Sequence, residues 1–291
     1  MPMPELPEVE TIARTLRPQV EGRLIGAAHV LLPKTMVCDA GLLQDVLPAR
    51  ICAVRRRAKL LLIDVAAHAA AAPTHILAFH LKMTGRLFVH GADAEPHKHT
   101  RLVFDLAPEG DVPAQRLFFD DVRTFGYCRL VRPEDLCGWP FWAKLGPEPL
   151  TMTAAEFSRT LGNRKSAIKA LLLDQTVVAG IGNIYADEAC FRSGIHPATP
   201  GAALSEAQRA VLCGNVQDVL NESIAECGSS IRDYRDANGD AGAFQNLFRV
   251  YGRAGQACVT CGTVLEKTVI AARTTVFCPV CQPRAHSKET P

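Results

Sequence analysis

The sequence predicts an α+β protein in which an antiparallel β-sandwich or barrel comes first, a helical domain follows, and a small metal-binding ribbon closes the chain. Three observations support this fold class. The first half carries a series of short β-like runs, the apolar period becomes helical near residue 150, and two Cys-x-x-Cys pairs lie close to the carboxyl end. A chain of 291 residues is also long enough for two domains and an appended module.

Composition narrows the class of protein further. With 48% hydrophobic and 21% charged residues, the chain is typical of a soluble globular protein, and no apolar run reaches the length of a membrane span. Acidic residues near the amino terminus replace the basic stretch of a secretory signal, so we expect a cytoplasmic protein. The formal net charge of +2 neither establishes nor excludes a polyanionic partner.

The first expected element is an amphipathic helix, because apolar residues recur at helical spacing from Pro7 to about Val20 and proline suits a first helical turn. Short β-like runs follow it, separated by breaks rich in Gly, Pro, Asp and Ala. They cover residues 24–32, 50–57, 60–65, 76–81, 86–89, 102–106, 116–119 and 127–131. Runs at this spacing indicate an antiparallel sandwich or barrel.

A domain boundary is expected at the stretch GPEPL, residues 146–150, which interrupts any regular element. Beyond it, helical periods cover residues 154–161, 166–174, 184–191 and 205–227, and a polar, glycine-containing stretch follows at 229–243. We therefore divide the chain into a β-sandwich domain with flanking helices (1–135), a linker (136–150), a helical domain (151–243), a zinc ribbon (244–283) and a tail (284–291).

The zinc ribbon is predicted from cysteine spacing. Cys258 and Cys261 form one pair, Cys278 and Cys281 form the other, and sixteen residues separate the pairs. Two such thiolate hairpins meet around one tetrahedral Zn²⁺ ion, and four sulfur ligands leave no coordination position for a reacting water. We expect one structural zinc ion. The other seven cysteines are scattered, which favours small core residues over a disulfide framework.

The amino terminus carries the motif PELPEVET, residues 4–11, which is denser in proline and acid than a helix start requires. Further motifs are RRAK at 56–59, HLKMTG at 80–85, DVRTFG at 121–126, GIGNIYA at 180–186 and VYGR at 250–253. In this order, and with GPEPL and the zinc ribbon, the sequence resembles the bacterial formamidopyrimidine-DNA glycosylases, also called 8-oxoguanine DNA glycosylases. The resemblance covers nearly the whole chain, and it implies a helix-two-turns-helix in the helical domain.

The resemblance implies a bifunctional glycosylase and abasic-site lyase of base excision repair, with Pro4 as nucleophile. An amino-terminal proline is a secondary amine with a pKa of roughly 8, so part of it is unprotonated at cellular pH and can attack a sugar carbon. The iminium that forms stays cationic, which favours base departure and then β,δ-elimination. Glu5 is placed to move protons, while Lys59 and Arg273 match residues that assist the eliminations and bind phosphate.

The start of the chain departs from the family pattern. The free proline of the family follows a single removed methionine, whereas Met1 and Pro2 precede Met3 here. Translation from Met1 would leave Pro4 locked in a peptide bond. We therefore expect Met3 to be the functional start and Pro4 the mature terminus.

The DNA contacts follow from the same motifs. Met83, Arg123 and Phe125 match the residues that the family inserts into the duplex when a nucleotide is flipped out, although Val122 and Thr124 replace the commoner proline and arginine of that loop. The remaining predicted contacts with the DNA backbone are His99, Arg164, Lys165, Asn183 and Tyr185. Glycines 180 and 182 would allow a close approach to a phosphate, with Asn183 capping the following helix.

Two other functions stay open from the sequence. One is an endonuclease VIII-like glycosylase that acts on oxidised pyrimidines, and the other is a non-catalytic zinc-ribbon protein that binds damaged DNA. Leu6, Val9 and the long stretch at 229–243, which could cap a purine, favour the purine enzyme. The expected partner is damaged double-stranded DNA, bound by a monomer. The preference among oxidised bases and the role of Arg232 are not fixed by the sequence.

Overall fold

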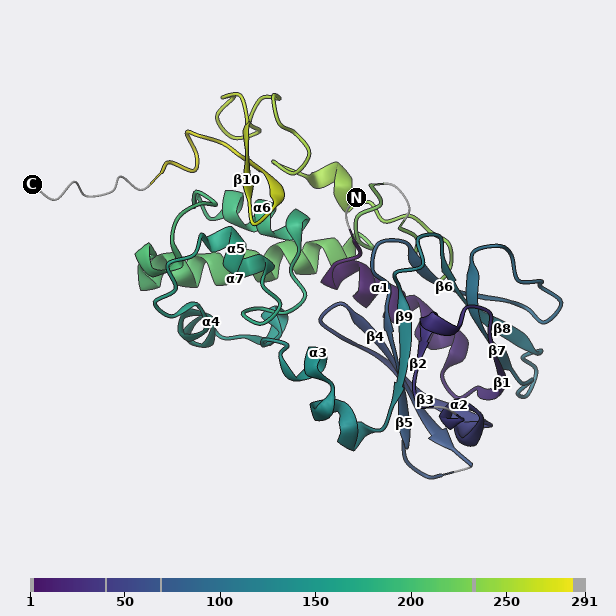
Figure 1. Ribbon diagram of the computed structural model, residues 1–291. Helices are drawn as coiled ribbons and strands as arrows, with labels where there is room; N and C mark the ends of the chain where they lie inside the picture. The colour runs from purple at the N-terminus through teal and green to yellow at the C-terminus, as the bar shows by residue number, and fades with distance from the viewer. Residues whose placement is uncertain (1–2, 40, 69, 232–233, 285–291) are drawn as a thin grey trace, which may run out of the picture. The chain divides into compact units, whose positions relative to one another are not determined.

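The computed structural model describes residues 3–39, 41–68, 70–231 and 234–284, drawn as a ribbon in Figure 1. The chain forms two compact units: residues 1–143 with 226–243, and residues 144–225 with 244–291. The predicted helical domain covers residues 151–243. Residues 226–243 instead belong to the first unit, because they pack against the first helix of the chain. Within the part that the structure describes, no helix is both long and apolar enough to cross a membrane.

The first unit is built around one long hydrogen-bonded series of strands. Its strands are β1 (Leu24–Val30), β2 (Met36–Val37), β3 (Ala49–Arg57), β4 (Leu60–Ala67), β5 (His75–His80), β6 (Gly85–Gly91), β7 (Thr100–Leu106), β8 (Gln115–Asp121) and β9 (Tyr127–Val131). The order is β2-β9-β5-β4-β3-β1-β7-β8-β6, and every pairing is antiparallel except that of β2 with β9. Each of the eight predicted runs is a strand, and β2, only two residues long, was not predicted.

The strand series folds over on itself as a sandwich. Phe79 in β5 contacts Phe104 in β7 and Phe119 in β8, with ring centroids 6.2 and 5.5 Å apart. Strands β5 and β8 are five steps apart in the series, which would separate them by about 24 Å in a flat sheet. The two halves therefore face each other around a shared apolar core, and the predicted antiparallel sandwich is confirmed.

Helix α1 (Leu6–Val20) packs its apolar stripe into this core. Val9, Ile12, Leu16 and Val20 are at most 1% exposed, and burying each side chain stabilises the fold by roughly 1.5–3 kcal/mol. The other two α-helices among the described residues of this unit are short: α2 (Leu42–Val46) and α3 (Pro140–Ala143).

The second unit contains four longer helices and a hairpin. These are α4 (Ala154–Leu161), α5 (Ile168–Leu173), α6 (Asn183–Arg192), α7 (Glu206–Ala225), β10 (Glu266–Ile270) and β11 (Arg273–Phe277). Thr153 begins α4 with a capping box: its hydroxyl accepts from the Glu156 N–H, and the Glu156 carboxylate accepts from the Thr153 N–H. All four predicted helices are present within two residues of their expected ends.

Candidate active site and metal centre

Two buried carboxylates surround the start of α1. Glu5 and Glu8 are each 2% exposed, and the Glu5 backbone N–H donates to Glu8 Oε2 at 2.9 Å. The other oxygen of Glu8 accepts from the Ser229 N–H at 2.8 Å. Pro4 is also buried and directly precedes this capping box. The predicted nucleophile and proton shuttle thus lie at the positive end of a helix dipole, where negative charge is stabilised.

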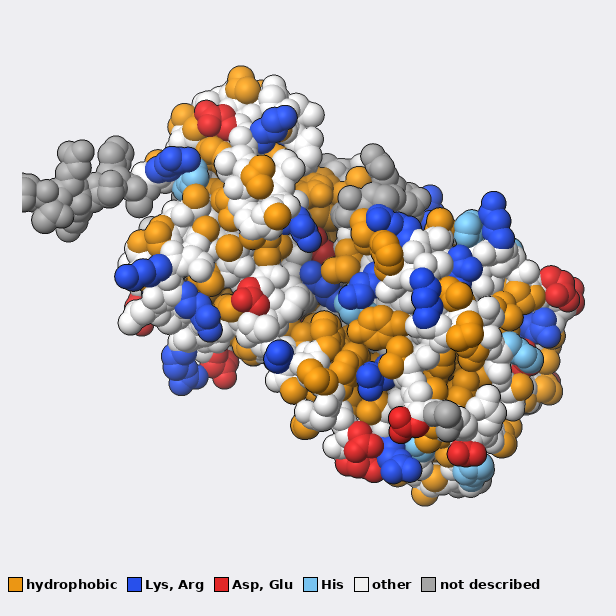
Figure 2. All heavy atoms as spheres, viewed as in Figure 1, with side chains coloured by type: hydrophobic (Ala, Val, Ile, Leu, Met, Phe, Trp, Pro, Cys, Tyr) orange, Lys and Arg blue, Asp and Glu red, His pale blue; other side chains and the backbone are white. Residues whose placement is uncertain are grey.

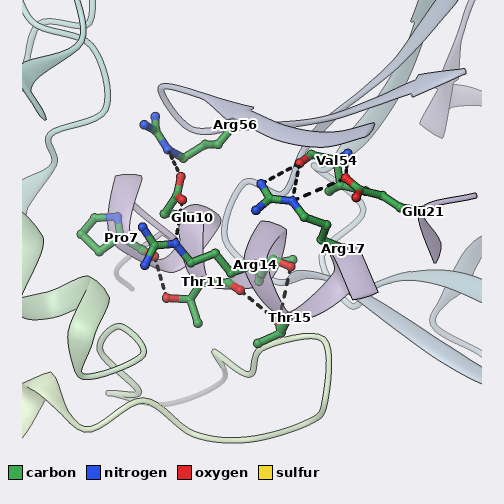
Figure 3. Close-up of polar contacts among 10 residues, drawn as sticks. Pro7, Glu10, Thr11, Arg14, Thr15, Arg17, Glu21, Val54 and Arg56 are labelled. Carbon is green, nitrogen blue, oxygen red and sulfur yellow. Dashed lines mark hydrogen bonds and ion pairs between the residues drawn. The ribbon is translucent and has the colours of Figure 1, made fainter. Parts of the chain in front are cut away.

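Arg56 contacts Glu10 of α1 (Figure 3) and also bonds the turn that carries Lys59. Its guanidinium donates to Glu10 Oε2 on α1 and to the Ala58 carbonyl in the turn between β3 and β4, both at 3.0 Å. Burial alone would raise the pKa of Glu10, but hydrogen bonds from Arg14 and Arg56 outweigh it and hold the pKa below its usual value. Glu10 is therefore an ionised carboxylate. The ion pair between Arg56 and Glu10 holds the Lys59 turn against α1, whose N-cap is Glu5.

Lys59 lies beside His80, a residue for which the sequence predicted no role of its own. Lys59 is 7% exposed and His80, at the end of β5, is 4% exposed. Burial, with the positive charges of Lys82 and Lys59, lowers the pKa of His80 to about 3. Its Nδ1 accepts from the Lys82 N–H at 3.2 Å. His80 is therefore neutral at cellular pH and places a polar ring among cations without adding charge.

Met83, Arg123 and Phe125 form one exposed cluster, although they come from two separate loops. Arg123 Nη1 lies 3.1 Å from Met83 Sδ, and its guanidinium carbon lies 5.0 Å from the centre of the Phe125 ring. Phe125 is 54% exposed and the neighbouring Val122 is 55% exposed. Figure 2 shows Lys and Arg side chains interspersed with apolar ones on the visible face of this unit. An exposed apolar and cationic cluster suits insertion between bases.

Asp121 organises the loop under this cluster. Its carboxylate accepts from the Thr84 hydroxyl, from the Arg123 N–H at 3.2 Å and from the Gly126 N–H at 2.7 Å. A side chain at Gly126 would lie 2.8 Å from the Phe119 ring, so only glycine fits. The buried carboxylate thus holds the loops that carry Met83 and Arg123 together through these hydrogen bonds.

His99 lies in an exposed basic loop of the first unit. Its N–H donates to His97 Nδ1 at 3.1 Å, and His97 Nε2 lies 3.0 Å from Asp120 Oδ2. Partial desolvation and the positive charges of Lys98 and Arg101 lower the pKa of His99. Its position permits the predicted DNA contact, which stays a prediction.

Asn183 does not cap α6 as expected. Gly182 is the N-cap, with φ −132°, and Asn183 is the first helical residue. The Asn183 side chain instead donates from Nδ2 to the Thr274 carbonyl, at 3.1 Å, in the hairpin that carries Arg273. Glycine at the cap carries no side chain, so a phosphate can approach the start of α6 closely.

The predicted DNA contact of Tyr185 is corrected by its burial. Tyr185 is 1% exposed; its hydroxyl lies 2.6 Å from Ser223 Oγ and its ring packs against Phe244. A side chain so enclosed supports α6 from within and cannot touch a DNA backbone. Arg164 and Lys165 are exposed between α4 and α5, where such contact is possible.

A buried ion pair, missed from the sequence, joins α5, α6 and the zinc hairpin. Lys169 Nζ lies 2.7 Å from Asp187 Oδ1, and both side chains have 0% exposure. Lys169 also donates to the Thr274 carbonyl at 3.1 Å and to Thr275 Oγ1 at 2.7 Å. Burial raises the pKa of Asp187 to about 6, against the opposing effect of Lys169. The pair thus fixes the strand that starts at Arg273.

Glu188, the next residue of α6, fixes the beginning of the metal-binding segment. Its carboxylate accepts from the backbone N–H groups of Arg249 at 3.0 Å, Val250 at 3.0 Å and Tyr251 at 2.8 Å. Adjacent acids in a helix usually indicate a solvated face, so this role could not be predicted from the residues alone.

Replacing Lys169 with methionine is expected to lower the free energy of unfolding of the second unit by about 3–5 kcal/mol, because the Asp187 carboxylate would stay buried without its partner. Urea denaturation, monitored by circular dichroism, measures this change in the free energy of unfolding. Lys165→Met, an exposed neighbour, is the matched control. The double variant Lys169→Met/Asp187→Leu should recover much of the loss, and equal effects of both single lysine variants would contradict the role of the pair.

The four cysteines of the ribbon meet as predicted. Their sulfur atoms all lie within 4.8 Å of one another, with Cys258 to Cys281 at 3.9 Å and Cys261 to Cys278 at 3.5 Å. A tetrahedral zinc ion with Zn–S bonds of 2.3 Å requires sulfur separations of about 3.8 Å, so the site fits zinc. Between the two cysteine pairs, strands β10 and β11 form a hairpin. They join through Ala271 and Ala272, both with positive φ, and Arg273 is exposed at the tip.

Comparison with known proteins gives three family matches in sequence order. The formamidopyrimidine-DNA glycosylase N-terminal domain matches residues 3–128, its H2TH domain matches 145–235, and the zinc finger found in FPG and IleRS matches 255–284. The last match and the sulfur geometry together assign one structural zinc ion to the four cysteines.

Whole-chain relatives agree with these matches. A formamidopyrimidine-DNA glycosylase of Nitratidesulfovibrio vulgaris is 44% identical, over 96% of this chain and 100% of the relative. A mutant Lactococcus lactis FPG in complex with Fapy-dG containing DNA has a TM-score of 0.86 and 33% identity, over 97% of this chain and 100% of that chain. Lactococcus lactis Fpg in complex with an abasic site containing DNA has a TM-score of 0.85 and 33% identity, over 96% of this chain and 100% of that chain.

Proposed function

The chain belongs to the formamidopyrimidine-DNA glycosylase family, and from this membership we propose that it excises oxidised purines from duplex DNA and then cuts the strand as an abasic-site lyase. Its substrates are 8-oxoguanine and formamidopyrimidines, and it acts as a monomer in the cytoplasm, at the nucleoid. The observation that carries the proposal is the buried start of α1. There Pro4 directly precedes the Glu5–Glu8 capping box, and Arg56 connects the same helix, through Glu10, to the Lys59 turn.

The chemistry begins with the unprotonated ring nitrogen of Pro4. Its lone pair attacks C1′ of the flipped nucleotide, and the base leaves with the electrons of the glycosidic bond and takes up a proton. The Pro4 nitrogen then loses its N–H proton, which balances the proton taken up by the base, and Glu5 protonates the sugar ring oxygen as the ring opens, so an iminium forms between Pro4 and C1′. The iminium acidifies C2′, loss of a proton there expels the 3′ phosphate, and a second elimination expels the 5′ phosphate. Lys59 and Arg273 assist these eliminations at the phosphates.

This chemistry requires Pro4 to be the mature terminus. The N-terminal domain match begins at residue 3, which supports translation from Met3 and removal of that single methionine. In the proposed active protein, Met1, Pro2 and Met3 are therefore absent and the chain begins at Pro4.

The remaining predicted residues hold the DNA. Met83 and Phe125 fill the gap that the flipped nucleotide leaves, and Arg123 addresses the orphaned base with its guanidinium. His99, Arg164, Lys165 and the first turn of α6 at Asn183 bind phosphates. Tyr185 contributes only by supporting α6 from its buried side.

Borohydride trapping on a duplex with 8-oxoguanine opposite cytosine tests the proposal. The reagent reduces the iminium, so a covalent protein–DNA adduct should form, and peptide mapping should place the link on Pro4. A duplex with thymine glycol opposite adenine is the comparison, and stronger trapping there would favour the pyrimidine-specific alternative. DNA binding without any adduct would identify a non-catalytic binder.

A further inference from the structure

Lys34 is an exposed cation whose side chain lies against the loop formed by residues 121–126, which we name the wedge loop. Its Nζ donates to Thr124 Oγ1 at 2.9 Å, across a separation of 90 residues in the sequence. Thr124 stands between Arg123 and Phe125, two exposed members of the cluster described above. A positive charge from a distant segment is thus placed directly beside that cluster.

The backbone that carries Lys34 is fixed on both sides. Lys34 is the central residue of a short 3-10 helix, Pro33–Thr35, and the side chain of Thr35 is fully buried. After this helix the chain enters β2, which pairs with β9. Before it, the Leu31 N–H donates to the Arg101 carbonyl at 2.9 Å. A cation on a fixed backbone loses less conformational freedom when it binds an anion.

The acceptor of this hydrogen bond, Thr124, is also held in place. Its φ is +57°, in the left-handed region that β-branched residues rarely adopt. The Asp121 carboxylate holds the backbone around it by accepting from the N–H groups of Arg123 and Gly126. The ammonium of Lys34 has three N–H donors, and the Thr124 hydroxyl occupies one of them. Two donors therefore stay available for a further acceptor.

The surroundings of Lys34 leave its charge without an anionic partner. In the described part of the chain, the hydrogen bond to Thr124 is the one polar contact of the Lys34 side chain, and no carboxylate forms an ion pair with it. A second cation, Arg101, donates from Nε to the carbonyl of Asp121 at 2.8 Å. The wedge loop thus gathers positive charge that its own carboxylate, which faces backbone N–H groups, does not pair with at Lys34. Such a surface favours a phosphate.

We propose that Lys34 binds a phosphate of the DNA backbone beside the inserted cluster, and that Thr124 is the positioning residue that holds its ammonium there. The inference rests on the proposed function, in which Met83 and Phe125 enter the duplex. Insertion of side chains between bases brings the sugar-phosphate backbone against the loop that carries them. A contact with phosphate carries no sequence information, so Lys34 contributes affinity rather than a choice of lesion.

The test measures the affinity for a duplex with a non-cleavable abasic analogue, by fluorescence anisotropy, between about 50 and 200 mM salt. Lys34→Met should reduce the slope of log K against log salt by about 0.9, the value for one lost phosphate contact. At about 150 mM salt its binding should weaken roughly five- to tenfold, as expected for a charged hydrogen bond. Lys34→Arg should retain both the slope and the affinity.

Arg50→Met is the matched control. Arg50 is an exposed cation of the same unit, but its side chain forms an ion pair with Glu109 at 2.7 Å and bonds no residue of the wedge loop. Its removal should leave the salt slope unchanged. Equal changes of slope in Lys34→Met and Arg50→Met would show a general effect of net charge and would overturn the contact.

Substitutions at Thr124 test the positioning role. Thr124→Ala should weaken binding about twofold and Thr124→Ser should not, because serine keeps the hydroxyl that accepts from Lys34. In a Lys34→Met background, Thr124→Ala should have no further effect, whereas Thr124→Arg should restore the salt slope by returning a cation to the same place. A loss from Thr124→Ala that is equally large without Lys34 would show that Thr124 acts on the loop alone.

An unchanged salt slope in Lys34→Met would overturn the phosphate contact. Failure of the unaltered protein to cut a duplex with 8-oxoguanine would instead overturn the proposed function. Because the Lys34 comparison is made on binding and the function is judged on cutting, the two failures are distinguishable.

Discussion

Protein that begins at Pro4 is expected to form the borohydride-trapped adduct, and protein that retains Met1, Pro2 and Met3 is expected to form none. The rate of strand cutting should differ by roughly three orders of magnitude or more between the two forms, because removal of a covalent nucleophile has effects of this size. The cause is electronic: an amide nitrogen shares its lone pair with the carbonyl and cannot attack C1′. Both forms can be made by cleaving a fusion at defined positions, and intact-mass measurement verifies each terminus.

Binding provides the control for this comparison. A duplex with a non-cleavable abasic analogue should bind both forms similarly, because the exposed Met83, Arg123 and Phe125 cluster lies in other loops. If the extended form cuts 8-oxoguanine duplexes at the same rate as the shortened form, or if the adduct of the shortened form maps to a residue other than Pro4, Pro4 is not the nucleophile.

Replacing Cys258 with serine is expected to release zinc and to weaken DNA binding by roughly 10²-fold. A structural zinc ion supplies much of the folding free energy of a small ribbon, so loss of one thiolate should unfold the hairpin. Arg273 and the Asn183 contact with Thr274 would then lose their fixed geometry, and their phosphate contacts with them. Zinc content by atomic absorption and DNA affinity by fluorescence anisotropy measure the two effects.

The matched control is Cys52→Ser, because Cys52 is an exposed cysteine that belongs to the first unit, whereas the four metal-binding cysteines belong to the second. It should retain one zinc ion and full DNA affinity. Amide exchange in β3 and β4 should be unchanged in Cys258→Ser. Retention of zinc and of DNA affinity by Cys258→Ser would contradict a structural role for the ribbon.

Local periodicity predicted most of the fold. The runs that became β1 and β3–β9 alternate or are continuously apolar, and α4 to α7 have clear helical periods, so each could be located from neighbouring residues alone. Cysteine spacing likewise predicted the metal centre, because a Cys-x-x-Cys hairpin presents both sulfurs through its own backbone turn.

Contacts between distant segments could not be predicted in this way. Lys169 and Asp187 look like exposed helical charges in the sequence, and only tertiary packing encloses them together with Thr275. The same applies to Tyr185, which packs against Ser223 and Phe244, and to residues 226–243, whose hydrogen-bond partners Glu8 and Thr15 lie more than 200 residues earlier in α1. Periodicity reports which face of an element is apolar, but not which partner covers it.

The strand order also bears on how the protein behaves at high local concentration. Edge strands with unpaired backbone groups can add strands from another molecule and begin aggregation. In the nine-stranded sheet the two outermost described strands are β2 and β6. The first offers only two residues, and the second is a seven-residue strand that carries Arg86 and His90 and ends in Gly91. On the β2 side, many copies crowded along one damaged duplex therefore have little edge through which to join into a common sheet, and on the β6 side Arg86 adds a charge to that edge.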